Sequence, residues 1–197
     1  MADITWPTTG RAFVMARQDE GIEWDVELTK SRSGKVTTFG LPGARWTCSV
    51  HVPHDTVANL RERRQLEALK LQLRGGANRL LLWNLLTPAP LGTMRGSPVV
   101  NGAVSAGANS LAITNVPGTT LLRGDRLGVG GQRIILTADA TLNGTIQFEP
   151  KLRNAVANGA AVVWDKPTTR YVLTDPRDVF PVDGTTLPGF SFDLVEE

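Results

Sequence analysis

The sequence predicts a mainly β protein, with a β-sandwich-like domain that carries one α-helix and a small β-barrel domain inserted into it. Three observations support this prediction. The 20 glycines and 12 prolines are spread along the 197 residues, short apolar runs alternate with period two, and one long segment contains neither glycine nor proline. Frequent turns between short runs are typical of sandwiches and barrels, whereas the uninterrupted segment favours a helix.

The first alternating run predicts a half-buried strand. Ile22, Trp24, Val26 and Leu28 point one way and three acidic residues point the other. A polar turn and a returning run follow, so residues 22–39 predict a hairpin. Two further runs, 46–52 and 190–194, alternate in the same way and predict two more strands.

The uninterrupted segment, 55–74, predicts the helix. Asp55 or Thr56 can cap its start, and Gly75 and Gly76 can stop it. On a helical wheel one face carries Leu66, Leu69 and Leu73, and the roughly opposite face carries Val57, Leu60 and Leu71. A helix that is apolar on two sides is covered on two sides, here by its own sheet and by a neighbouring domain or subunit. Leu71 can alternatively belong to a frayed end or to the following strand.

The segment 79–85 predicts a strand buried on both faces, because it lacks strict alternation. After it, few charges and closely spaced β-like runs predict a small barrel over 96–165. The ring-forming parent domain would then consist of 1–95 and 166–197. The expected barrel strands are 110–115, 120–122, 127–129, 132–137, 145–149 and 160–164.

Charge and hydropathy exclude several classes of protein. Lys and Arg number 21 against 19 Asp and Glu, which does not indicate a polyanionic partner. The longest apolar stretch, 80–83, has four residues, whereas a membrane-spanning helix needs roughly 20. The N-terminus does not read as a signal peptide, and the one cysteine fits synthesis in a reducing cytoplasm. We therefore expect no membrane partner.

Catalytic and metal-binding patterns are weak in this sequence. Cys48, His51 and His54 have a spacing that suggests zinc, but strand residues three apart point to opposite faces. The sequence lacks a nucleophile elbow and a phosphate-binding loop. The residues 123–125 predict a tight turn, and the five tryptophans are expected mainly to fill cores. We therefore expect no enzyme activity, no catalytic residues, no cofactor and no metal.

Several phrases together resemble the distal tail protein family of long, non-contractile-tailed phages. The resemblance lies in the order of strands, hairpin and helix and in short phrases along most of the chain, at 61–67, 79–83, 92–96, 122–127, 148–153 and 189–196. It implies a virion structural protein of the tail tip, or baseplate, made in the host cytoplasm. Proteins of this family form hexameric rings that join the tail tube to the tail-tip hub and leave a channel for DNA.

The partners implied by the resemblance are further copies of the chain, a tail-tube protein and a tail-tip hub protein, with DNA only as passing cargo. Because a rotational interface that closes gives a ring, the doubly apolar helix and the hairpin are the expected subunit contacts. The interface candidates are Trp24, Lys35, Leu60, Arg61, Arg63, Arg64 and Leu71.

Three alternatives stay open at this point. A tail-tube or tail-completion protein would share the sandwich, the helix and the ring. A carbohydrate-binding module would carry an exposed tryptophan, for which Trp164 and Trp6 are the candidates. A nucleic-acid-binding module would use the basic helix, although its charges surround the helix rather than form one stripe.

Overall fold

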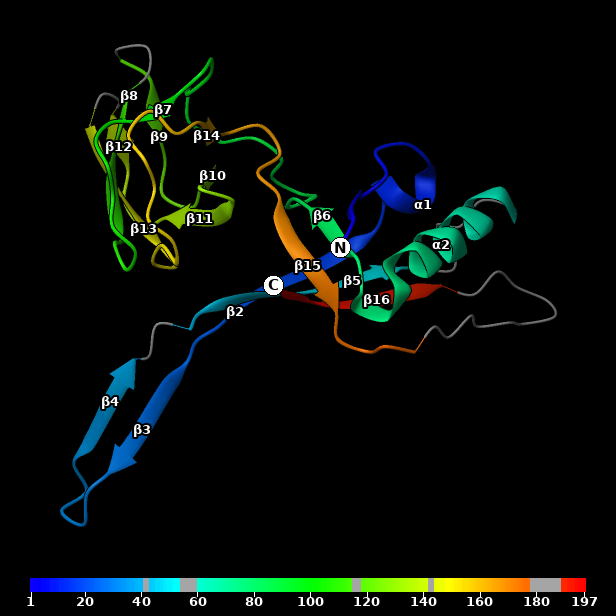
Figure 1. Ribbon diagram of the computed structural model, residues 1–197, viewed down its shortest axis with the longest axis horizontal. Coiled ribbons are helices and arrows are strands. Elements are labelled where there is room, and N and C mark those ends of the chain that lie inside the picture. Colours follow the sequence, from blue (N-terminus) through cyan, green and yellow to red (C-terminus); the bar gives the residue numbers. More distant parts are fainter. Residues whose placement is uncertain (41–42, 54–59, 115–117, 142–143, 178–188) are drawn as a thin grey trace. The chain divides into compact units, whose positions relative to one another are not determined.

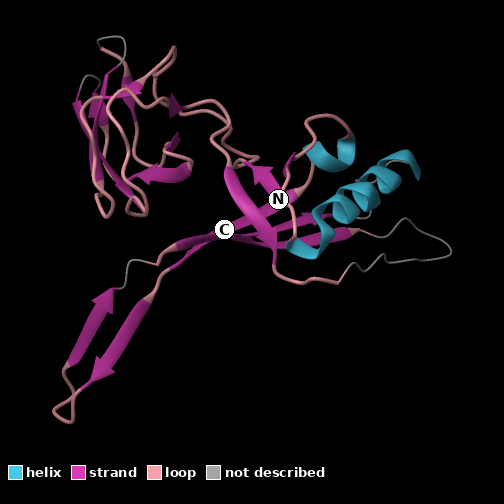
Figure 2. Cartoon of the chain, in the orientation of Figure 1, coloured by secondary structure: helices cyan, strands magenta, loops and turns pink. Residues whose placement is uncertain are grey.

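A computed structural model describes residues 1–40, 43–53, 60–114, 118–141, 144–177 and 189–197 (Figure 1). Strands account for 43% and helices for 12%, so the predicted mainly β class with a helix and a small barrel is confirmed. The chain forms two compact units. Unit 1 comprises Met1–Gly21, Trp46–Leu86 and Thr169–Glu197, and unit 2 comprises Ile22–Arg45 and Thr87–Thr168. Within the described residues, helices occur in unit 1 alone (Figure 2).

Unit 1 is built on a six-stranded sheet with the order β1-β6-β15-β16-β5-β2. β1 runs parallel to β6, and the pairs β6/β15, β15/β16 and β16/β5 are antiparallel. The predicted strands at 46–52 and 190–194 are confirmed as β5 and β16. The bounds are β1 Asp3–Thr5, β2 Arg17–Glu23, β5 Arg45–Val52, β6 Arg79–Leu82, β15 Thr169–Leu173 and β16 Phe190–Glu196.

One face of this sheet is buried, as the alternation predicts for a sheet covered on one side. Phe190, Phe192 and Leu194 of β16 lie opposite Val52, Val50 and Cys48 of β5, and all six are buried. In β6 the pattern is one-sided as well: Leu80 and Leu82 are buried, while Arg79 and Leu81 are half-exposed. The prediction that this strand is buried on both faces is therefore wrong.

Helices contact the buried face of the sheet. Trp6 makes edge-to-face contacts with Phe13 of α1 (Arg11–Val14) and with Phe192, with ring centroids 5.6 and 5.8 Å apart. Helix α2 (Leu60–Leu73) buries Leu66, Leu69 and Leu73, the face predicted from its spacing, and passes into a 3₁₀ turn at Arg74–Gly76. The proposed caps, Asp55 and Thr56, and Val57 lie outside the described residues. In the described part of unit 1, the layer over the sheet is thus helical rather than a second sheet.

Unit 2 contains a nearly closed barrel. Its sheet has the order β14-β10-β11-β13-β8-β7, and a bridge between Val99 and Ala161 joins its two edges. Within the same stretch of sequence, β9 and β12 form a separate antiparallel pair. The bounds are β7 Val99–Val100, β8 Ser110–Thr114, β9 Thr120–Leu121, β10 Arg126–Val129, β11 Gln132–Leu136, β12 Ala140–Thr141, β13 Gly144–Glu149 and β14 Val162–Val163. The core of the barrel is formed by apolar side chains between Met94 and Val162.

The remaining strands form a two-stranded hairpin, β3 (Val26–Lys30) and β4 (Val36–Gly40), which we call the arm. The arm lies within unit 2, although the sequence assigns it to the parent domain. The unit boundaries at 87 and 168 also lie outside the predicted insertion of 96–165. Pro88 accepts a backbone hydrogen bond from Lys166 (2.6 Å), so the two connections to unit 1 leave the barrel side by side.

Candidate subunit interface and pocket

The arm is held by its own backbone and by a tight turn. Val26 pairs with Gly40, Leu28 with Thr38, and Lys30 with Val36. At the turn, the Ser31 amide donates to the Lys35 carbonyl and the Gly34 amide to the Ser31 carbonyl, both at 2.9 Å. Within the described residues these strands pair only with each other. A two-stranded hairpin is marginally stable on its own in water, so the arm is a segment that gains from a partner.

One face of the arm is apolar and exposed. Directly opposite residues and residues two apart share a face, which places Val26, Leu28 and Val36 together. Their side chains are 43%, 68% and 56% exposed. The other face carries Thr29 opposite Thr37. The predicted hairpin is confirmed over 26–40, although its first strand begins only after Trp24 and Asp25. The prediction that its apolar face is half-buried is wrong, because all three of its side chains are exposed.

Trp24, an interface candidate, precedes β3 and is 52% exposed. Lys35, the second candidate from this segment, is exposed next to the turn. Both are therefore accessible to another molecule. Val26, Leu28 and Val36 were not named as interface candidates, although alternation around a polar turn is the signal that places them on one face.

Helix α2 presents a second exposed apolar pair. Leu60 is 62% exposed and Leu71 is 55% exposed, so Leu71 lies within the helix and on its outer face. Eleven residues of helix separate them by roughly 16 Å and return to nearly the same side. Arg61 and Arg64 are exposed on this helix as well. These four candidates are accessible, and the leucines are two separate apolar points rather than one patch.

Arg63 differs from the other helix candidates because it is buried. Its side chain is 11% exposed and its Nε lies 2.9 Å from Oε1 of Glu67, one turn further along α2. Its guanidinium also lies over the ring of Phe190 at 5.6 Å, which connects α2 with β16. The assignment of Arg63 to a subunit contact is therefore corrected, because this side chain is used in the core of its own unit.

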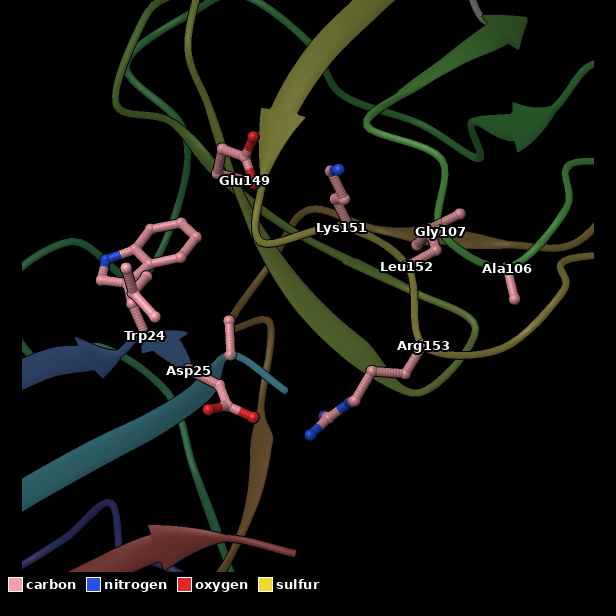
Figure 3. Close-up of a pocket in the computed structure, with 10 residues that line it drawn as sticks. Trp24, Asp25, Ala106, Gly107, Glu149, Lys151, Leu152 and Arg153 are labelled. Carbon is pink, nitrogen blue, oxygen red and sulfur yellow. The ribbon is translucent and has the colours of Figure 1, made fainter. Parts of the chain in front are cut away.

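A pocket of about 790 Å³ opens within unit 2 beside Trp24 (Figure 3). Figure 3 shows acidic and basic side chains, those of Asp25, Glu149, Lys151 and Arg153, among the residues that line it. Sequence reasoning missed its barrel residues, because nothing in their local pattern distinguishes them from ordinary turn residues. The lining consists of Trp24, Asp25, Val26, Ala44, Ala106, Gly107, Glu149, Lys151, Leu152 and Arg153.

The barrel wall of this pocket is fixed by hydrogen bonds. Buried Gln132 donates from Nε2 to the Lys151 carbonyl and accepts at Oε1 from the Arg153 amide, both at 2.9 Å. The Gly107 amide donates to the carbonyl of Leu152 (2.6 Å). The backbone that carries Lys151 and Arg153 is therefore held in place, while their side chains border solvent.

The rings of the other tryptophans are less accessible to a ligand than the ring of Trp24. Trp6, Trp46 and Trp83 are 1%, 2% and 7% exposed, which confirms core filling and excludes Trp6 as an exposed platform. Trp164 donates from Nε1 to the Gly96 carbonyl, and the guanidinium of Arg95 covers its ring at 5.0 Å. Trp24 is thus the tryptophan with an accessible ring.

The structure describes two of the three residues whose spacing suggests zinc. Cys48 is buried, His51 is exposed on the same strand and bonds Ser191 of β16 through Nδ1 (3.1 Å), and His54 lies outside the described residues. Across the described ranges, no group of three or more His, Cys, Asp or Glu side chains is placed to hold a metal ion. The segment 123–125 forms the expected turn, in which Asp125 is buried and bonds backbone amides.

No protein-family model matches this chain, and no curated protein matches its sequence. None of the helices described is long and apolar enough to cross a bilayer.

Proposed function

We propose that this chain is a virion structural protein that assembles into a ring at the distal end of a phage tail. In this proposal the ring joins the tail tube to the tail-tip hub and leaves a DNA channel. A hexamer is the number implied by the resemblance to distal tail proteins. The single observation that carries the proposal is the exposed apolar face of the arm, Val26, Leu28 and Val36.

The physical argument is that such a face needs cover. Removing apolar surface from water contributes roughly 25 cal/mol per Å², so exposed valine and leucine side chains on a marginal hairpin favour association. Unpaired strand edges of the same hairpin can accept another strand. The exposed side of α2 in unit 1 is a second, different surface, on which Leu60 and Leu71 are two separate apolar points. Two unlike surfaces on one chain suit head-to-tail contacts, and head-to-tail contacts that close give rings.

The test is the molar mass in solution by light scattering over a range of concentrations. We expect a closed species larger than a dimer in the wild-type protein. Substituting Val26, Leu28 and Val36 together by Thr keeps strand propensity but removes apolar surface, so the closed species should require at least about tenfold more protein. The matched control replaces Thr29 and Thr37, on the other face of the arm, by Ser. Equal assembly of the two variants would contradict the proposal.

A second candidate function is carbohydrate binding, favoured by Trp24 with an accessible ring beside a pocket. Aromatic rings with nearby polar groups can recognise sugars, and Asp25 and Glu149 supply such groups here. Titration with host polysaccharide should shift tryptophan fluorescence in the wild-type protein but not in Trp24→Phe if the ring of Trp24 reports binding. An equal shift in Trp24→Phe would exclude this pocket as the site.

A further inference from the structure

The charges around the arm are separated along the chain. The segment 22–27, called here the acidic segment, contains Glu23, Asp25 and Glu27 and neither Lys nor Arg. The segment 30–35, called here the cationic tip, contains Lys30, Arg32 and Lys35 and neither Asp nor Glu. Because like charges are grouped, their fields add instead of cancelling.

Most of these charges are accessible. Glu23, Glu27 and all three tip cations are exposed, and their side chains have no hydrogen-bond or ion-pair partner among the residues that the structure describes. Glu20 precedes this segment and accepts from Asn84 (2.7 Å) and Gln18 (2.8 Å) inside unit 1. Asp19 has a long ion pair with Arg17 at 3.8 Å. The exposed acids and cations are thus available to another molecule.

Within one arm, the two groups are poorly placed to neutralise each other. Glu27 and Lys30 lie on opposite faces of β3, because they are three residues apart on a strand. Their separation along the strand is about 10 Å, which exceeds the Debye length of about 8 Å at physiological salt. Glu23 lies further still from the turn. Exposed charges at this distance attract each other weakly.

We propose that the cationic tip of one copy docks on the acidic segment of a second copy of this chain. The inference rests on the proposed ring and names the contact that would align its subunits. Opposite charges attract the cationic tip of one copy to the acidic segment of another, whereas two cationic tips repel each other. This difference sets the direction of association. The apolar face of the arm supplies burial at the same contact, and the charges supply its register.

Two charge-reversal variants test this contact. One is Arg32→Glu with Lys35→Glu, and the other is Glu23→Lys with Glu27→Lys. Each replaces attraction by repulsion, so each should raise the concentration for half-assembly at least about tenfold. The chain that carries all four substitutions, and a mixture of the two double variants, should return to within about threefold of wild type. Without recovery in either, the proposed contact is wrong.

The matched control is Arg123→Glu with Lys166→Glu, which changes the net charge as much as the tip variant. Both of these side chains are exposed on the barrel, away from the arm in the sequence. An equal loss of assembly in the control would show that net charge alone causes the loss in the tip variant, and it would overturn the inference. Loss of binding to duplex DNA in the tip variant, with unchanged assembly, would identify the tip as a nucleic-acid contact instead.

A zero-length carbodiimide cross-link separates this inference from the ring proposal. Wild-type protein in ordinary and ¹⁵N-labelled form is mixed at high concentration, and amide bonds between Lys30 or Lys35 and Glu23 or Glu27 are sought by mass spectrometry. Mixed-isotope links support docking between copies, and their absence overturns it. Mixed-isotope links together with a species no larger than a dimer would keep the docking contact but contradict the ring.

Discussion

Asp125 uses both carboxylate oxygens to organise the start of the barrel. Oδ1 accepts from the Leu91 amide (2.8 Å), and Oδ2 accepts from the amides of Gly92 (3.2 Å) and Leu122 (2.8 Å). Asp125 is buried, with 5% of the residue exposed. Hydrogen bonds to an ionised acceptor are stronger than neutral ones, and buried amides without a partner are costly. This one residue therefore connects the incoming segment with the turn at 123–125.

We expect Asp125→Ala to lower the free energy of unfolding of unit 2 by about 2–4 kcal/mol, because three amides lose their acceptor. Chemical denaturation measures the change. The matched control is Asp139→Ala, whose exposed carboxylate accepts from one amide, that of Arg123 (2.7 Å), and which should cost less than about 1 kcal/mol. Equal costs for the two variants would contradict the role given to Asp125.

Arg63 and Arg64 are neighbours in sequence with different environments. Reversal to Glu at position 63 would place a carboxylate beside Glu67 and over the ring of Phe190, in a largely buried site. We expect Arg63→Glu to destabilise unit 1 by about 2–4 kcal/mol, and Arg64→Glu to change it by less than about 0.5 kcal/mol. Thermal unfolding checks both. Equal melting temperatures would show that the contacts of Arg63 contribute nothing.

At the scale of elements, alternation and turn residues predicted six strands of unit 2 and β5, β6 and β16 of unit 1, but not β7, β12 or β15. They succeeded because a strand covered on one side must alternate, whatever lies elsewhere in the chain. The same pattern could not tell that the arm is exposed. Alternation at Val26 and Leu28 shows that one face is apolar, but it carries no information on which molecule covers that face. The burial of Arg63 was missed for a similar reason, since its partner Phe190 is distant in sequence.

The turn between β10 and β11 gives a prediction at this scale. Val129 pairs with Gln132, so the loop consists of Gly130 and Gly131, with φ of 59° and 80°. Positive φ at both positions is typical of the turn that joins two-residue hairpins. A Cβ at position 130 would also lie 2.9 Å from Cγ2 of Val156.

We expect Gly130→Ala to destabilise the barrel by about 1–2 kcal/mol through backbone strain and this contact. Gly159→Ala is the control, because Gly159 has φ of 78° but open space around it. The control isolates the strain, so it should cost less than Gly130→Ala in denaturant unfolding. If Gly130→Ala cost no more than Gly159→Ala, the contact with Val156 would add nothing to the backbone strain.

At the scale of the whole molecule, the barrel carries its own core. All fourteen buried side chains of its main cluster lie between Met94 and Val162, and none comes from the arm or from unit 1. The two connections run side by side where Lys166 bonds Pro88. A segment with a separate core and adjacent ends is expected to fold by itself.

The fragment 87–168 should therefore unfold cooperatively as an isolated domain, whereas the fragment 96–165, cut at the boundaries suggested by the sequence, should be less stable by about 3–5 kcal/mol. The shorter fragment lacks Met94, which is fully buried in the core and whose amide bonds the Thr120 carbonyl (3.1 Å). It also lacks the amides of Leu91 and Gly92, which leaves buried Asp125 without these donors. Circular dichroism during urea unfolding of both fragments measures the difference. Equal stability would show that 87–95 is a linker rather than part of the barrel. In that case the apolar runs and turn residues of 96–165 would be sufficient to specify the barrel.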